Sequence, residues 1–233
     1  MMQQEGEHAQ KRWPQMMALA VLLSIPGCGG TTSEVVTDPM IAQYGIKRVA
    51  ILPFTVTHPT VGQERGYATP APPPTAAEKL ADIFYVKLNA REGLTVISPH
   101  RVRESVAAIP AVPTRAWLQE FGERLGVGAV LEGAVGVYKE RKGSAIGLER
   151  AQDAAEVGFG VRLVSTKDGV IIWTGEYYER QRPLTEDLSG FLERGARYLT
   201  VEELANSAVD HVLLGFPLGR PSQRTSRAAG FFP

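Results

Sequence analysis

The sequence predicts a single α/β domain of the α+β type, in two or three layers, with a roughly five-stranded mixed sheet and about four helices. Three observations lead to this fold class: short apolar runs typical of buried strands, amphipathic stretches with helical spacing, and capping or turn residues between them. Their order is strand, helix, strand, helix, helix, three strands and helix. Helices on one or both faces of the sheet would bury the apolar stripes.

The domain is expected to begin near Ile46 with a strand. The run Lys47–Phe54 (KRVAILPF) turns apolar after two positive charges, which is typical of a buried strand. Residues 57–75 are rich in proline and glycine and are predicted to form a loop. The first helix is then predicted to start at a capping box, in which Thr75 and Glu78 would satisfy free backbone N–H groups.

A short strand and two more helices are predicted before residue 126. Leu94–Ile97 is the strand, and Ser98-Pro99 is a typical N-cap and first-turn pair for the helix that follows. Thr114 is expected to cap the third helix and Gly126 to end it.

The second half of the domain is predicted to hold three strands. Gly128–Tyr138 is the first, and the segments 156–165 and 170–178 form a hairpin around the turn Lys167-Asp168-Gly169. Two apolar sets are expected to face each other in that hairpin. They are Val157, Phe159, Val161 and Leu163 in one strand, and Ile171, Trp173 and Tyr177 in the other.

The N-terminus has the features of an export signal. Lys11 and Arg12 precede Met16–Ile25 (MMALAVLLSI), an apolar stretch too short for the roughly 20 residues of a membrane-spanning helix but typical of a signal peptide. The segment Ile25-Pro26-Gly27-Cys28 resembles the lipobox of bacterial lipoproteins. The resemblance implies cleavage before Cys28 and acylation of that residue, palmitate included, as a membrane anchor. An unmodified Cys28 thiol is the alternative.

The C-terminal part is predicted to close with a helix and a tail. Thr200 and Glu203 have capping-box spacing ahead of a helix that runs to Leu214. The domain boundaries that follow are 1–27 for the signal peptide, 28–45 for the lipidated cysteine and a flexible linker, 46–216 for the domain, and 217–233 for a disordered tail. The linker of about 17 residues would reach at most ~60 Å when fully extended.

Charge and cysteine content exclude several classes of protein. Lys+Arg and Asp+Glu both total 25, so the chain has no basic excess and no nucleic-acid partner is expected. Cys28 is the only cysteine, which excludes an intramolecular disulfide.

No cofactor, no metal ion and no catalytic residue are predicted. The histidines of the mature chain, His58, His100 and His211, lack the spacing of a zinc site and are interpreted as ordinary surface or core residues. The glycines 126, 128 and 133 lie at a helix end and along a strand, where they are interpreted as a cap and as close-packing positions. Glu149, Asp153 and Glu156 are interpreted as part of a solvated surface.

Three aromatic residues near the end of the hairpin could either pack on the core or form part of a partner surface. Trp173 and Tyr177 are expected to pack on the core. Tyr178 would point to the other side of the sheet, where it could contribute to a partner surface, although a structural role is favoured because strands are enriched in aromatics.

The segments KRVAILPF, GLTVISPHRV and LGVGAVLEGAVGVY, with the helices between them, resemble a group of periplasmic lipoprotein domains. The group includes the curli secretion channel protein CsgG, the cell-wall synthase activator LpoB and the N-terminal domain of TolB, and the resemblance covers about residues 46–215. It implies an envelope protein that acts by binding other proteins. The charged segment 139–155 lacks the alternation of a membrane-barrel hairpin, so a CsgG-like pore is not expected.

The functional hypothesis is therefore a non-enzymatic lipoprotein, anchored to the outer membrane and facing the periplasm. It would bind an unidentified envelope protein in assembly, secretion or cell-wall synthesis. The outer membrane is implied because Gly29 stands where an aspartate would favour inner-membrane retention. Two alternatives stay open, a periplasmic hydrolase with an unrecognised site and a homo-oligomer assembling into a ring.

Overall fold

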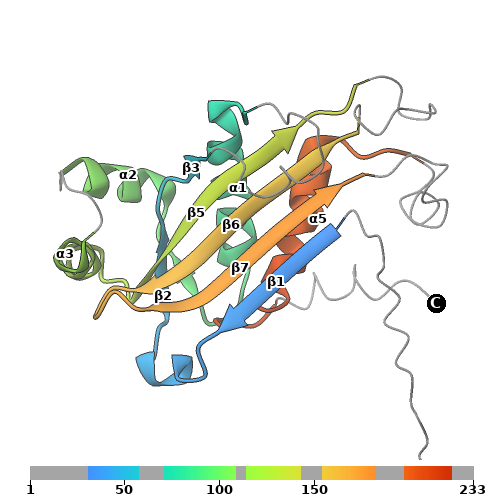
Figure 1. Ribbon diagram of the computed structural model, residues 1–233. Coiled ribbons are helices and arrows are strands. Elements are labelled where there is room, and N and C mark those ends of the chain that lie inside the picture. The colour runs from blue at the N-terminus through green and yellow to red at the C-terminus, as the bar shows by residue number, and fades with distance from the viewer. Residues whose placement is uncertain (1–30, 58–70, 109–113, 143–153, 182–196, 222–233) are drawn as a thin grey trace, which may run out of the picture.

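The computed structural model describes residues 31–57, 71–108, 114–142, 154–181 and 197–221 (Figure 1). The described part confirms the predicted fold class, with a mixed sheet and four α-helices. The sheet has seven strands, two more than expected, in the order β1-β7-β6-β5-β2-β4, with β3 also pairing with β5. The pairs β2–β4, β2–β5 and β3–β5 are parallel, and the pairs among β5, β6, β7 and β1 are antiparallel.

Apart from β1 and β3, which were not predicted, the strands and helices follow the predicted order. The strands are β1 (Thr31–Thr37), β2 (Arg48–Ile51), β3 (Thr55–Val56), β4 (Thr95–Val96), β5 (Ala129–Lys139), β6 (Glu156–Ser165) and β7 (Ile171–Arg180). The helices are α1 (Pro74–Asn89), α2 (Pro99–Ala108), α3 (Arg115–Leu125) and α5 (Val201–Leu213), with a short 3-10 turn η1 (Ile41–Tyr44) after β1.

Helices cover the two faces of the sheet unequally. On one face, α1 and α5 bury the large core that includes Phe84, Leu131 and Trp173. On the other face, α2 and α3 form a smaller core around Phe121 and Val130, which covers β2 and the neighbouring ends of β5 and β6. No described helix covers the rest of that second face.

Local capping chemistry explains several helix boundaries. The Thr114 side chain accepts a hydrogen bond from the Trp117 N–H, and Gly126 ends α3 in the left-handed conformation, as predicted. The capping box of Thr200 and Glu203 is present at the start of α5. The box predicted at Thr75 is wrong, because α1 begins at Pro74, whose fixed φ suits the first helical position.

The predicted hairpin of β6 and β7 is confirmed, with one correction. The turn contains Gly169 at φ 73°, a conformation that glycine adopts at no steric cost. Val157, Phe159, Val161 and Leu163 are buried, as are Trp173 and Tyr177. Ile171 is 46% exposed, because the register shifts between Leu163 and Val164 and brings Ile172 into the core in its place.

The segment 28–45 is not the flexible linker that the sequence predicts. Its described part contains β1, which pairs antiparallel with β7 over all seven residues, and η1. Thr and Val make up five of the seven residues of β1 and favour extended structure. The described part of the fold therefore begins at Thr31, three residues after Cys28.

The start of the predicted disordered tail is also part of the fold. Phe216 and Leu218 are buried, and Glu92 and Arg220 form a β-bridge. The three nitrogens of the Arg91 guanidinium donate hydrogen bonds to the carbonyl oxygens of Leu213, Phe216, Leu218 and Gly219 at 2.9–3.3 Å. These contacts fix the chain as far as residue 221, and residues 222–233 lie outside the described part.

Candidate functional site

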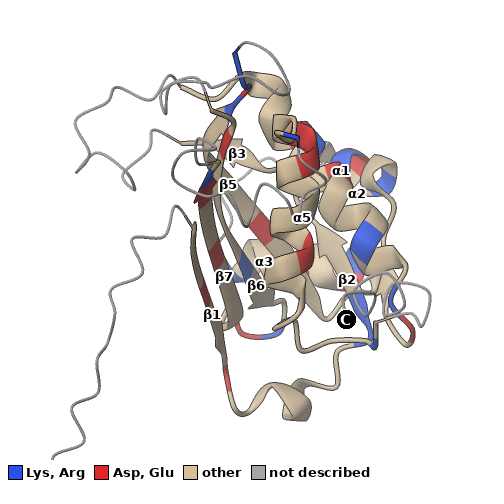
Figure 2. Cartoon of the chain, turned by 90° about the vertical axis from the view of Figure 1, so that its right-hand side faces the viewer, with Lys and Arg blue, Asp and Glu red and all other residues tan. Residues whose placement is uncertain are grey.

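The uncovered part of the sheet, which we call the open face, is the candidate site. It is the side of β5, β6, β7 and β1 that is turned away from α1 and α5 (Figures 1 and 2). Figure 2 shows the sheet nearly edge-on, with α1 and α5 on one side of it. Three rows of residues cross the four strands there: Glu132, Arg162, Thr174 and Val36; Ala134, Gly160, Glu176 and Glu34; and Val137, Gly158, Tyr178 and Thr32.

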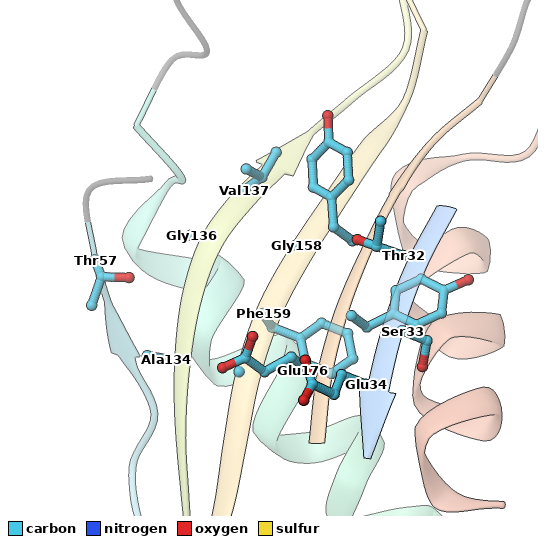
Figure 3. A pocket seen from close by; sticks show the side chains of 13 residues that line it. Thr32, Ser33, Glu34, Thr57, Ala134, Gly136, Val137, Gly158, Phe159 and Glu176 are labelled. Carbon is cyan, nitrogen blue, oxygen red and sulfur yellow. The ribbon is translucent and has the colours of Figure 1, made fainter. Parts of the chain in front are cut away.

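A hollow of about 330 Å³ lies on the open face (Figure 3). Residues of all four strands line it, together with Thr57 after β3. The lining residues are Thr32, Ser33, Glu34, Thr57, Ala134, Gly136, Val137, Gly158, Phe159, Gly160, Glu176, Tyr177 and Tyr178.

Small residues make the floor of the hollow. Ala134 and Gly160 stand side by side in the central row, with Gly136 and Gly158 beside them. A Cβ atom built on Gly160 would meet nothing nearer than the Cγ of Glu176 at 3.9 Å. The space above Gly160 is therefore unfilled, and the strand accepts the lower stability of an interior glycine there.

Tyr178 forms one wall of the hollow. Its ring lies near Val137 over Gly158, where a Cβ would come within 3.1 Å of the Tyr178 ring and 3.3 Å of Val137. The Tyr178 hydroxyl donates to Glu156, and Lys139 approaches the other oxygen of that carboxylate at 3.9 Å. The interpretation of Glu156 as solvated is wrong, since it is 6% exposed and fixes Tyr178.

Two carboxylates stand on the other side of the hollow. Glu176 of β7 and Glu34 of β1 are directly opposite each other and both are exposed. Side chains at such positions have Cβ atoms about 5 Å apart, and like charges there are destabilising. Among the described residues, no cation lies within 4 Å of either carboxylate, whereas Glu132 in the next row is paired with Arg162 at 2.6 Å.

The aromatic residues on the core side have structural roles, as predicted. The Trp173 indole N–H donates to the Gly215 carbonyl at 3.0 Å, and its ring packs edge-on against Phe216. The Tyr177 hydroxyl donates to Glu179, and burial together with that carboxylate raises the pKa of the Tyr177 phenol. Tyr178 lies on the open face instead, beside Gly158, as its position in the strand predicts.

The histidines that the structure describes show no metal site. His100 lies in the first turn of α2, is exposed and pairs with Glu104 at 3.6 Å. His211 lies in the last turn of α5, with its ring centroid 5.6 Å from that of Tyr177. Within the described ranges, no three His, Cys, Asp or Glu residues come together as metal ligands.

Several predicted residues lie outside the described part. They are Cys28, His58, Glu149 and Asp153. Of the glycines, Gly126 is the cap of α3, and Gly133 allows close packing, since a Cβ there would be 2.5 Å from the Phe54 ring. Gly128 precedes β5, and a Cβ atom built on it would lie 3.2 Å from the Ile46 side chain. Of the helices in the described segments, none has both the length and the apolar character needed to cross a membrane.

Comparison with known proteins gives structural likeness only. No family model matches the sequence, and no curated protein matches it. One similar solved structure is a PelC dodecamer from Paraburkholderia phytofirmans. Its sequence is 16% identical, the match covers 78% of this chain and 94% of that chain, and the TM-score is 0.48. Lipoprotein GNA1162 from Neisseria meningitidis has 20% identity, 69% and 99% coverage and a TM-score of 0.35.

The LpoB C-terminal domain from Salmonella enterica is also similar, with 13% identity, 58% of this chain and 83% of that chain covered, and a TM-score of 0.34. LpoB is thus among the similar solved structures, and the resemblance to CsgG stays a prediction. At these identities and scores the likeness is one of strand and helix arrangement, and the function must be argued from the open face.

Proposed function

We propose that this chain is a non-enzymatic envelope lipoprotein, anchored through acylated Cys28 on the periplasmic face of the outer membrane, that binds a protein partner on its open face. The observation that carries the proposal is the contrast between the two faces of the sheet. One face is closed by α1 and α5, whereas the other has an unfilled hollow with a small-residue floor and two exposed carboxylates.

The composition of the hollow favours binding over catalysis. Its lining includes three hydroxyl side chains of Ser and Thr but no histidine, cysteine or lysine, and among the described residues none of these hydroxyls is hydrogen-bonded to Glu34 or Glu176, as a nucleophile is to its general base. Exposed surface of mixed apolar and polar character, with an aromatic residue at its margin, is instead typical of protein interfaces. Assembly, secretion and cell-wall synthesis are the envelope processes in which such a lipoprotein would act.

Two experiments test this proposal separately. The intact mass of membrane-extracted protein should show a chain that begins at Cys28 and carries acyl groups, and the Cys28→Ala variant should lose them. An unacylated wild-type chain would refute the anchor.

The binding surface is tested by a photo-activated cross-linking residue placed at Thr174 on the open face and, as a matched control, at Glu120 on the exposed side of α3. We expect an adduct with an envelope protein from position 174 only. The Gly160→Trp variant should remove that adduct, because the new ring would occupy the hollow. Equal labelling from both positions, unchanged in Gly160→Trp, would refute the open face as the binding surface.

A further inference from the structure

The outer edge of β1 is an unpaired sheet edge. β1 is the last strand of the sheet and pairs with β7 alone, and no other described strand lies along its far side (Figure 1). Natural sheets usually protect such edges with lysine, proline, bulges or a short strand. β1 (TTSEVVT) has seven residues, no lysine, no proline and no register shift against β7.

The hydrogen-bond pattern shows which backbone groups face outward. The Asp38 N–H donates to the Ile172 carbonyl at 3.0 Å, so this residue pair is of the hydrogen-bonded kind. Because antiparallel pairs alternate, Thr32, Glu34 and Val36 use their backbone groups toward β7. The N–H and C=O groups of Ser33 and Val35 then point away from the sheet, as those of the two terminal residues of β1 do. An added strand would find a complete set of donors and acceptors there.

The side chains beside this edge define the charge of such a strand. Ala134, Gly160, Glu176 and Glu34 form one row across the open face, and an added strand would place its own residue next to Glu34. A lysine or arginine at that position would face Glu34, with Glu176 one strand farther on. In the rows on either side, the added residues would stand next to Thr32 and Val36.

A second copy of this chain fits the edge poorly. Antiparallel pairing of two β1 strands over all seven residues places Glu34 opposite Glu34 of the other copy. Four carboxylates would then stand in one row, Glu176 and Glu34 from each chain, without a cation. A register shifted by two residues avoids this row but pairs only five residues of each copy, either 33–37 or 31–35.

We propose that β1 accepts an extended strand of a partner protein, with a lysine or arginine next to Glu34, as an eighth strand of the sheet. The inference rests on the proposed function, since it takes the partner to lie on the open face. It adds three details: the partner segment binds at the outer edge of β1, it pairs through its backbone, and it carries a positive charge. Backbone pairing would supply affinity, and the row of Glu34 and Glu176 would supply selectivity.

The test uses the full chain in detergent and two labelled peptides. Both are eight-residue peptides of alternating valine and threonine, one with a central lysine and the other with a central glutamate at the same place. Fluorescence anisotropy should show that the lysine peptide binds about tenfold more tightly than the glutamate peptide. The lysine is attracted by the carboxylates of Glu34 and Glu176, whereas the glutamate is repelled by them. Glu34→Lys should invert the preference.

Ser33→Pro separates backbone pairing from charge. It removes an outward N–H that β7 does not use, so the strand should remain in the sheet while binding of both peptides falls by about tenfold or more. Ser33→Ala is the matched control and should bind as the wild type does. Thermal unfolding of each variant identifies any that fails to fold, in which case Glu34→Lys alone decides.

Several results would overturn the proposal. They are no binding of the lysine peptide at about 1 mM, equal binding of the two peptides, or a dimer that dissociates in Ser33→Pro. If the cross-link from Thr174 persists while the peptides fail, the partner uses the open face without adding a strand. If the cross-link is also absent, the proposed function itself fails.

Discussion

Two glycines of neighbouring strands should respond in opposite ways to the same substitution. A Cβ on Gly175 would be 2.5 Å from the Val212 Cγ1 of α5 and 2.9 Å from the Trp173 ring, and both of those residues are fully buried. Gly160 points to the open face, where the nearest atom would be 3.9 Å away. Gly175 therefore has no room for a methyl group, whereas Gly160 has.

The expected magnitudes differ in sign. Gly175→Ala should lower the free energy of unfolding by about 1–3 kcal/mol, because a stiff valine and an indole must both move. Gly160→Ala should leave the free energy unchanged or raise it by up to about 1 kcal/mol, since alanine restricts the unfolded chain and fits the strand. In a domain of this size 1 kcal/mol corresponds to about 2–4 °C in Tm.

Urea unfolding followed by tryptophan fluorescence would measure both variants against the wild type, with circular dichroism to confirm the fold. If Gly160→Ala were as destabilising as Gly175→Ala, something would cover Gly160 in the folded chain. The open face would then not be a free surface, and the proposed binding site would have no basis.

Three further predictions concern other parts of the domain. Arg91→Lys should lower the free energy of unfolding by about 3 kcal/mol, because a lysine cannot donate to all four carbonyl groups at the end of α5 and just after it. Urea unfolding would measure this loss. A loss below about 0.5 kcal/mol would mean that Arg91 does not hold the chain after α5 in place. Arg197 and the Thr200 N–H lower the pKa of Glu203 to about 2, so this group stabilises the fold above pH 4.5 and the effect is lost as the pH falls toward 2. The difference in Tm between wild type and Glu203→Gln should therefore shrink over that range, and a difference that grows would refute the assignment. Burial raises the pKa of Tyr138 to about 12, so the Tyr138→Phe variant should lose an absorbance titration step near that pH while other tyrosines titrate unchanged.

Local chemistry made much of the fold predictable. A cap is decided by residues within one helical turn, so Thr114, Gly126 and the Thr200–Glu203 pair could be identified from the sequence. The hairpin turn at Gly169 is equally local. The start of α1 was missed by two residues, because Thr75 was predicted as the N-cap, whereas Pro73 is the N-cap and Pro74 the first helical residue.

Features that depend on distant pairing could not be predicted. In the sequence, β1 resembles a polar linker. Its partner β7 lies about 140 residues later, and only pairing with β7 gives β1 one face toward the core and one toward the open face. The exposure of Ile171 likewise follows from a register shift. The candidate site depends on both distant pairing and register, since Gly160, Glu176 and Glu34 form one row only when three strands are aligned. The orientation of Tyr178 was the one local signal of that site.

The position of β1 also changes where a partner can be. If Cys28 is the anchor, two residues separate it from the sheet, so the start of β1 lies within about 10 Å of the acylated residue, compared with the ~60 Å that a free linker would allow. Neutron reflectometry of the acylated protein on a supported bilayer should therefore find the domain in contact with the headgroups. A water layer of tens of ångströms between them would mean that β1 leaves the sheet at the membrane, and it would remove the strand edge on which the proposed partner site depends. Contact would instead restrict partners to proteins that reach the same membrane surface, because the tether is too short to carry the domain toward the opposite one.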